Sequence, residues 1–295
     1  MGVALPLILA AASVGAGAGA DPPSVQYQLA PQAGVVSFGR MRVGAKVRTY
    51  RLFVPRVRAR RAPLVVALHG GGSRETGQRF AEVLKFDAEA AVRGFVVVYP
   101  DALGGRFNAG GCCNRGVTDV RFVDRLLARV ADRHRIDRRR VFATGFSNGG
   151  FLAYTLACRR AATFAAVAGV ATTEVARRCR PARPVSILHF HARNDSRLAY
   201  GRGRRFSENV TTPSIPGLIR AWRRRDRCGP ARTLRLSANL EQQRALCAQR
   251  TEVRLLTSST AGHSWPGADP PYGAHEAFSL TATIGAFFAA RRPRG

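Results

Sequence analysis

The segment Val141-Phe-Ala-Thr-Gly-Phe-Ser-Asn-Gly-Gly-Phe-Leu-Ala-Tyr-Thr-Leu-Ala157 leads from a short apolar strand into a helix through the turn Gly145-Phe-Ser-Asn-Gly149. Gly-x-Ser-x-Gly between a strand and a helix is typical of a nucleophile elbow, where the serine occupies a strained turn and small neighbours avoid collisions. Ser147 is therefore the candidate nucleophile. The amide of Asn148 lies at the helix N-terminus, where unpaired N–H groups favour negative charge, and is a candidate oxyanion donor. An ordinary glycine-rich turn is the alternative interpretation.

Apolar runs on both sides of this segment predict a parallel sheet. Residues 64–68 and 95–99 lack polar alternation, as expected of strands covered by helices on both faces. Residues 75–93, between these two runs, are long enough for a crossover helix. Further strands are expected at residues 34–38, 47–54, 164–170, 185–190 and 253–257, and further helices at residues 118–131 and 274–290. The fold class is therefore α/β, with a mostly parallel, doubly wound sheet flanked by helices.

Catalytic partners of the serine should follow the carboxyl ends of the strands. Asp195 comes directly after a predicted strand and is the candidate acid, whereas Asp226 and Glu208 lie in Arg-rich sequence and are interpreted as surface ion-pair members. The chain order Ser, Asp, His requires a histidine after the acid. His263 lies in a loop past a strand and is favoured over His275, which begins the last predicted helix.

A second oxyanion donor is expected in the loop His69-Gly-Gly-Gly72, which follows the strand at residues 64–68. Glycines there let backbone amides approach a carbonyl oxygen closely, and Gly71 is the candidate donor. A tight turn without this role is the alternative. The other histidines, which are interpreted as structural or solvated residues, are His69, His134, His189 and His191. Neither a metal site nor an organic cofactor is expected.

The composition sets limits on the class of protein. With 295 residues and 46% hydrophobic residues, the chain can bury one large core. The net charge of +29 suggests nucleic-acid binding, but all except two of the 47 Lys and Arg residues are arginine, a skew typical of GC-rich coding sequence. The arginines are scattered and do not alternate with aromatic residues, so a specific nucleic-acid site is not expected. Non-specific binding to polyanions is expected from the charge alone.

The beginning of the chain is typical of an export signal. Residues 3–14 form a largely apolar run too short to span a bilayer, and Ala18-Gly-Ala20 offers the small residues that signal peptidase requires. Residues 1–20 are therefore predicted to be a signal peptide of a secreted protein, and residues 21–295 a single catalytic domain. Because no Lys or Arg precedes the apolar run, an uncleaved N-terminal helix or a misplaced start are alternatives.

An even number of cysteines agrees with an oxidising compartment, where cysteines pair. They are Cys112, Cys113, Cys158, Cys179, Cys228 and Cys247. The last two flank one polar insertion and are expected to form a disulfide. The other four are expected to pair between the first two and the middle two, because adjacent cysteines bridge each other only with strain. Zinc is disfavoured, since no Cys-x-x-Cys spacing is present.

Taken together, six short motifs resemble the secreted esterase family that contains polyhydroxybutyrate depolymerases and feruloyl and acetylxylan esterases. They occur in the family's order: Leu68-His-Gly-Gly71, Asn108-Ala-Gly-Gly-Cys-Cys113, Asp119-Val120, Gly145-Phe-Ser-Asn-Gly-Gly150, Cys179-Arg-Pro-Ala-Arg-Pro-Val185 and Gly262-His-Ser-Trp-Pro-Gly267. The resemblance implies an α/β-hydrolase fold over about residues 47–290. It maps a Ser-Asp-His triad onto Ser147, Asp195 and His263, and implies a serine esterase that needs no cofactor.

The sequence departs from the family pattern at three places: Ala192-Arg193-Asn194 before the acid, Thr118, and Phe107, where the family often has Gly-Thr, an acidic residue and tryptophan. Phe107, Asn108 and Trp265 are the candidate substrate contacts, because flat aromatic side chains suit a phenolic acyl group or a sugar ring. A core position is the alternative interpretation for Phe107 and Trp265, and Phe146 is interpreted as either a contact or a core residue.

The substrate class expected is the feruloyl, acetyl and other short-chain esters of plant polysaccharide. Enzymes that degrade solid polyhydroxybutyrate commonly carry an adsorption domain and a linker, and neither is recognised in this sequence. Depolymerisation of polyhydroxybutyrate oligomers is the alternative within the family. A serine peptidase and a non-catalytic relative that binds a partner are the alternatives from other classes.

Overall fold

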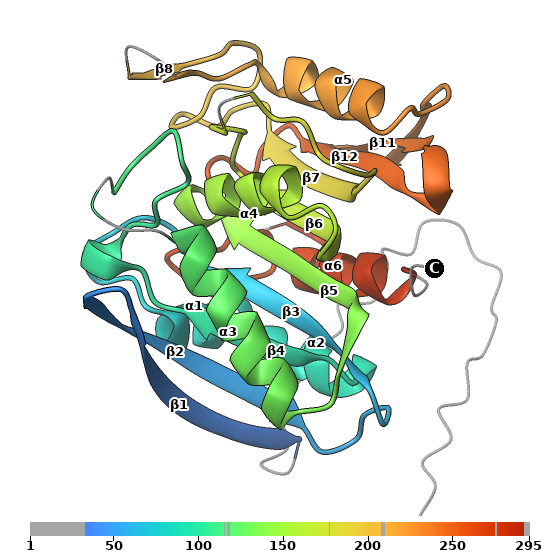
Figure 1. Cartoon of the computed structure of the whole chain (residues 1–295). Coiled ribbons are helices and arrows are strands. Elements are labelled where there is room, and N and C mark those ends of the chain that lie inside the picture. The colour runs from blue at the N-terminus through green and yellow to red at the C-terminus, as the bar shows by residue number, and fades with distance from the viewer. Residues whose placement is uncertain are drawn as a thin grey trace, which may run out of the picture.

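The computed structural model describes residues 33–114, 116, 119–176, 178–207, 210–274 and 276–291. Its centre is a ten-stranded sheet in the order β1-β2-β4-β3-β5-β6-β7-β12-β11-β10 (Figure 1). The strands are β1 (Gly34–Val43), β2 (Lys46–Pro55), β3 (Ala62–Leu68), β4 (Val96–Pro100), β5 (Ile136–Phe146), β6 (Phe164–Val170), β7 (Ser186–Ala192), β10 (Arg232–Ser237), β11 (Leu240–Leu246) and β12 (Glu252–Ser258). The six strands from β4 to β12 are parallel, and the pairs at both edges are antiparallel.

Helices cover both faces of this sheet. They are α1 (Gly77–Leu84), α2 (Phe86–Arg93), α3 (Asp119–Arg133), α4 (Asn148–Arg159), α5 (Ile215–Arg225) and α6 (Leu280–Ala289). Two core clusters lie on opposite faces, one with α3, α4 and α5 and the other with α1, α2 and α6 (Figure 1). In β3, Leu64, Val66 and Leu68 point into the first cluster, and Val65 and Ala67 into the second. Both faces of the central strands are buried, which explains their unbroken apolar runs.

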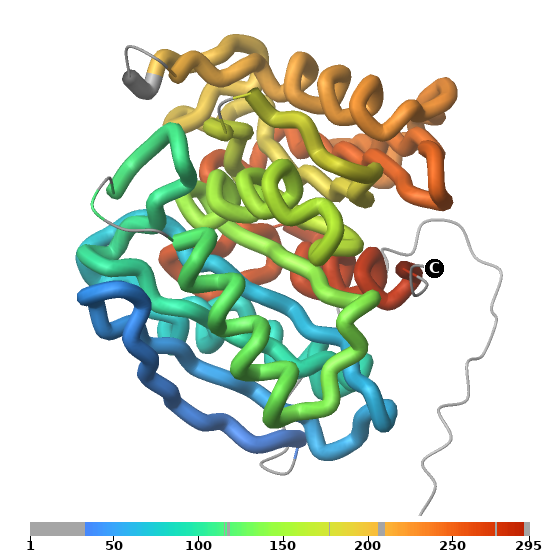
Figure 2. Tube along the Cα trace, viewed as in Figure 1, coloured from blue at the N-terminus to red at the C-terminus, as the bar shows by residue number. Residues whose placement is uncertain are grey.

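The chain passes from one edge of the sheet to the other. In Figure 2, the β1–β2 hairpin (blue) and the α5 to β11 region (orange) lie at opposite sides of the molecule. A small two-stranded sheet, β8 (Arg205–Ser207) and β9 (Val210–Thr211), lies beyond β7 in the sequence. The expected α/β class with a mostly parallel, doubly wound sheet is confirmed.

Three elements differ from the sequence-based expectations. Residues 75–93 form two helices rather than one, because Lys85 between them adopts a left-handed conformation with φ of +53°. The polar insertion between Cys228 and Cys247 forms the β10–β11 hairpin, which continues the sheet from β12. The last helix begins at Leu280 rather than at residue 274.

The structure pairs the cysteines as Cys112–Cys113, Cys158–Cys179 and Cys228–Cys247. The last pair confirms the prediction, but the pairing expected between the other two groups is wrong. The chain after β6 returns along α4, so that Cys179 comes to 5.2 Å from Cys158 between Cα atoms. Cys112 then bonds to its neighbour, where the backbone of Cys113 adopts φ of +148°.

A buried ion pair fixes the loop that follows β4. Arg48 of β2 donates to Asp119 of α3 at 2.5 Å, and its guanidinium lies 4.0 Å from the centre of the Phe122 ring. The second oxygen of Asp119 accepts the backbone N–H of Asn108 at 2.6 Å. One carboxylate therefore ties β2, α3 and this loop together, which gives the Asp119-Val120 motif a structural role.

Several predictions fall on parts of the chain outside the described residues. These are the signal peptide at residues 1–20 and the alternative residues Glu208 and His275. Among the helices of the described ranges, none combines the length and the apolar character needed to cross a membrane.

Candidate active site

Ser147 lies at a tight turn between β5 and α4. Its backbone adopts φ of +49° and ψ of −113°, a conformation that L-residues rarely take. The backbone comes very close here: a Cβ atom at Gly149 would lie 2.1 Å from the carbonyl oxygen of Leu68, and one at Gly145 would lie 2.4 Å from the carbonyl carbon of Gly149. Only glycine fits at these two positions. The turn has the geometry expected of a nucleophile elbow.

Asp195 and His263 come from separate loops and meet in a hydrogen bond. Nδ1 of His263 lies 2.8 Å from Oδ2 of Asp195. The loop after β12 carries His263 to the elbow, where its ring lies 5.0 Å from the ring of Phe146, the residue before the serine. The structure thus brings the candidate base and acid to the carboxyl ends of β5, β7 and β12.

Asp195 is held as a carboxylate. Burial alone would raise the pKa of Asp195, but hydrogen bonds from His191, His263 and the backbone of Leu198 hold this pKa well below its usual range. The backbone N–H groups of Arg197 and Leu198 donate to Oδ1, both at 2.8 Å. The acid therefore stays charged across the neutral pH range, as an imidazole-orienting residue requires.

The two candidate oxyanion donors are neighbours. A Cβ atom at Gly71 would lie 3.3 Å from Cβ of Asn148. The side chain of Asn148 is engaged on the other side, where it accepts the N–H of Phe107 at 2.7 Å and donates to its carbonyl at 3.1 Å. These hydrogen bonds keep the amide side chain away from the backbone N–H, which is the group expected to bind an oxyanion.

His69 fixes the loop that carries Gly71. Its Nδ1 lies 2.7 Å from the carbonyl oxygen of Gly70, so this nitrogen carries the proton, and its Nε2 accepts the N–H of Ala102 at 3.1 Å. Burial lowers the pKa of His69, which agrees with a neutral ring. The structural role expected for this histidine is the one observed.

Two of the three candidate substrate contacts do not reach the surface. Phe107 and Trp265 are both 0% exposed. The ring of Phe107 packs 4.6 Å from that of His69, and Nε1 of Trp265 donates to Thr281 at 3.0 Å. Both side chains are core residues, and the prediction that they contact substrate is corrected. Asn108 is half-buried and accepts the N–H of Gly110 at 2.8 Å through its side chain.

Asp226 is also corrected, because it is fully buried at the end of α5 and accepts the N–H of Val185 at 3.3 Å. A surface ion pair was expected from the surrounding arginines. The sequence gives no indication that this position turns inward.

Sequence reasoning missed two residues beside the elbow. Tyr272 donates its hydroxyl to Glu75, and its ring lies edge-on to that of Phe146 at 4.8 Å. Burial and the neighbouring carboxylate raise the pKa of this phenol well above its usual range. The side chain of Arg106 lies against Gly71, with its Cγ 3.5 Å from where a Cβ would be. Neither residue lies in a short motif that would have indicated the site.

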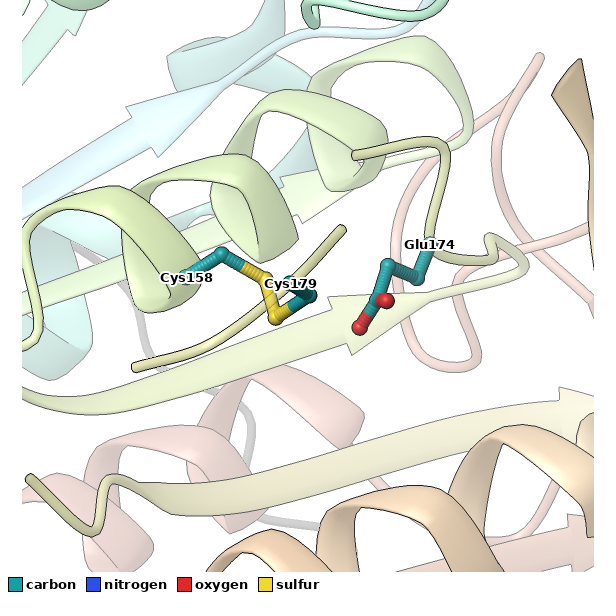
Figure 3. A group of neighbouring side chains, drawn as sticks. All are labelled: Cys158, Glu174 and Cys179. Carbon is teal, nitrogen blue, oxygen red and sulfur yellow. A yellow bond between two sulfur atoms is a disulfide. The ribbon is translucent and has the colours of Figure 1, made fainter. Parts of the chain in front are cut away.

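A cluster with metal-binding residue types lies away from this site. Potential ligand atoms of Cys158, Glu174 and Cys179 lie within 4.8 Å of one another (Figure 3). The two sulfurs are joined in a disulfide, and Glu174 binds Arg225 through both carboxylate oxygens at 2.6 and 2.9 Å. These donors are already occupied, so the cluster has a structural role.

The sheet topology, the serine elbow and the Asp–His pair at the ends of the parallel strands define the α/β-hydrolase class. A family profile described as "Esterase PHB depolymerase" matches residues 48–193. The feruloyl esterase module from Clostridium thermocellum, solved in complex with sinapinate, superposes with a TM-score of 0.58 at 13% identity and covers 88% of each chain. This likeness supports the fold.

Two relatives share sequence with the chain. The bifunctional acetylxylan esterase/xylanase of Neocallimastix patriciarum is 30% identical over 162 residues, which cover 55% of this chain and 23% of the relative. Feruloyl esterase B of Piromyces equi is 26% identical over 215 residues, which cover 69% of this chain and 40% of the relative. The chain thus spans less than half the length of either relative. It belongs to the esterase family that contains polyhydroxybutyrate depolymerases and feruloyl esterases.

Proposed function

We propose that the protein is a secreted serine carboxylic ester hydrolase, with Ser147 as nucleophile, His263 as base and Asp195 as the residue that orients the base. The observation that carries the proposal is the strained serine turn beside the Asp195–His263 hydrogen bond. Backbone strain of this kind persists only where surrounding contacts enforce it, and such strain clusters at catalytic sites. The family membership supports the esterase class independently.

In the first step, His263 takes the proton of Ser147 while the serine oxygen attacks the ester carbonyl. Because Nδ1 of His263 donates to Asp195, its Nε2 is the nitrogen without a proton and is able to act as base. The charge of Asp195 stabilises the imidazolium that forms. His263 then returns the proton to the alcohol that leaves, and an acyl-serine results.

The carbonyl oxygen becomes negative during this attack, and we assign its binding to the backbone N–H groups of Gly71 and Asn148. Both N–H groups belong to residues that other contacts hold in place, so they need no reorganisation during the reaction. In the second step, water replaces the serine as nucleophile and passes through the same sequence of proton transfers. The acid is released and the enzyme is regenerated.

Feruloyl and acetyl esters of plant polysaccharide, and other short-chain esters, are the substrates we propose. The relatives named for acetylxylan and feruloyl esterase activity support this class. The family name supports polyhydroxybutyrate oligomers as the second candidate. The three disulfides support export to an oxidising compartment.

A substrate panel tests the proposal: p-nitrophenyl acetate, methyl ferulate, acetylated xylan, 3-hydroxybutyrate oligomers and a peptide anilide. We expect hydrolysis of the esters and not of the anilide. Ser147→Ala and His263→Ala should each lower ester hydrolysis by roughly a million-fold, as loss of a triad nucleophile or base does. His275→Ala is the matched control and should retain activity. Loss of activity in this control with retention in His263→Ala would contradict the base assignment.

A further inference from the structure

A line of buried hydrogen bonds leads from the core to Asp195. The hydroxyl of Tyr154 on α4 lies 2.8 Å from Nδ1 of His189, and Nε2 of His189 lies 3.2 Å from Nδ1 of His191. Nε2 of His191 lies 3.3 Å from Oδ2 of Asp195. The two histidines share one face of β7, with their rings nearly parallel and 5.4 Å apart. All four side chains are at most 4% exposed.

The carbonyl oxygen of Leu198 fixes the positions of the protons along this line. It lies 2.7 Å from Nε2 of His191, and because a carbonyl only accepts, this nitrogen must carry hydrogen. In a neutral imidazole the other nitrogen is then an acceptor, so Nδ1 of His191 accepts from Nε2–H of His189. Nδ1 of His189 in turn accepts the hydroxyl proton of Tyr154. The donors of Tyr154 and His189 therefore point along the line toward His191, whose Nε2–H lies within reach of both the carbonyl of Leu198 and Oδ2 of Asp195.

The inner two groups keep their protonation states at neutral pH. Burial and the neighbouring His191 hold the pKa of His189 well below its usual range, and burial raises the pKa of Tyr154. The charged groups that face the inner end of the line are Glu174 and Arg225, paired at 2.6 Å.

At the outer end, the titratable groups are Asp195 and its partner His263. On a third side, the ring of Tyr200 packs 6.1 Å from that of His191, and the guanidinium of Arg193 lies 5.1 Å from the Tyr200 ring. The line is therefore enclosed by groups that are paired or stacked.

We propose that His191 is a positioning residue for the catalytic acid, and that Tyr154 and His189 hold it in the tautomer that donates to Asp195. The proposal rests on the triad put forward above. Oδ2 of Asp195 accepts Nδ1–H of His263 at 2.8 Å, and it shares with the carbonyl of Leu198 the single Nε2–H of His191, which lies 3.3 Å from Oδ2 and 2.7 Å from that carbonyl. The donor from His191 opposes rotation of the carboxylate and draws charge away from the oxygen that faces His263.

Removing this donor has two consequences. The carboxylate is less well oriented, so the first chemical step slows. Its oxygen is also more basic, so it holds the protonated imidazole of His263 more strongly and the acid limb of the kcat/KM profile moves to higher pH. A side chain that only fills space in the core would change stability without moving this limb.

The test compares His191→Leu, which removes the donor, with His191→Gln, whose amide nitrogen restores a donor near the place of Nε2. We expect His191→Leu to lower kcat about ten- to a hundred-fold, the effect of one hydrogen bond to a charged group, and to move the acid limb upward by roughly one pH unit. His191→Gln should recover most of both changes. Phe190→Leu, at a fully buried position on the opposite face of β7, is the matched control. It should change neither kcat nor the position of the acid limb.

Tyr154→Phe keeps the test decisive if His191→Leu does not fold. It removes one hydroxyl at the far end of the line, and we expect the acid limb to move upward by a smaller amount. Two results would overturn the proposal. One is that His191→Leu and His191→Gln change kcat and the acid limb equally, and the other is that the acid limb stays in place in folded His191→Leu and Tyr154→Phe. If Ser147→Ala and Asp195→Asn stay active, the proposed function itself fails; if they lose activity while the limb does not move, only this inference fails.

Discussion

Replacing Asp195 by asparagine alters one group of the side chain, and the surrounding hydrogen bonds dictate how the new amide lies. Oδ1 of Asp195 accepts the backbone N–H groups of Arg197 and Leu198, both at 2.8 Å. Two N–H donors require an oxygen at this position. The NH₂ group of the asparagine must therefore take the place of Oδ2 and face Nδ1 of His263, 2.8 Å away.

An N–H donor at this place forces His263 into the other tautomer. His263 must then present an unprotonated Nδ1, so its proton moves to Nε2, the nitrogen that should receive the proton of Ser147. The same replacement in a serine protease triad lowers kcat about ten-thousand-fold through this wrong tautomer. We expect a loss of the same size here, which corresponds to about 5.4 kcal/mol of transition-state stabilisation.

The assay is the kcat for p-nitrophenyl acetate at neutral pH, with circular dichroism to show that the variant is folded. Asp269→Asn is the matched control, because it removes an equal charge from the segment after His263. Its carboxylate is 51% exposed and pairs with Lys85 at 2.8 Å, so we expect kcat to change less than about twofold. A folded Asp195→Asn with a loss smaller than about tenfold would refute the tautomer argument.

Two further predictions concern stability. Asp119→Ala leaves a buried arginine without its partner and should lower the free energy of unfolding by about 3–5 kcal/mol, whereas Asp132→Ala, from an exposed pair, should cost less than about 1 kcal/mol. Urea unfolding of both variants measures this, and equal costs would contradict the role given to burial. Burial lowers the pKa values of His69 and His189 from their ordinary value of 6.5. When the pH falls below 6.5, these histidines therefore bind protons in the unfolded state that they do not bind in the folded state. Stability should therefore fall from about pH 7 to about pH 5.5, by up to about 1.4 kcal/mol per pH unit for each histidine. His189→Gln should reduce the slope, and a slope that is unchanged in this variant would contradict the assignment.

Much of the fold was predictable because its central strands are buried on both faces. The apolar run at residues 164–170 coincides with β6 (Phe164–Val170), and the helix expected at residues 118–131 corresponds to α3. A strand covered on both sides has no polar positions, so its sequence alone marks it. The elbow was equally accessible, because its requirements are local.

The elements that were missed depend on contacts between distant parts of the chain. The strand β10 is exposed at every position and is rich in polar residues, so only its pairing with β11 indicates a strand. Lys85 gives no glycine or proline signal, yet the helix breaks there. Cys112 and Cys113 pair because the return of the chain along α4 provides Cys158 with another partner.

In the candidate site too, local motifs were predictable and contacts between distant residues were not. The residues in the serine, acid and histidine loops were proposed from motifs, and the structure brings Asp195 and His263 within hydrogen-bonding distance. The supporting residues lie outside any motif: Tyr272 reaches Glu75 across 197 positions of sequence. From their chemical type, Phe107 and Trp265 suited either substrate contact or the core, and only the packed structure shows that they are buried.

Covalent labelling with a fluorophosphonate, followed by peptide mass spectrometry, tests the central claim most directly. We expect one adduct per chain, on Ser147, with loss of esterase activity in proportion to labelling. Labelling should be absent in Ser147→Ala and much slower in His263→Ala. An adduct on another serine that accounts for the activity, or full esterase activity in folded Ser147→Ala, would contradict the account.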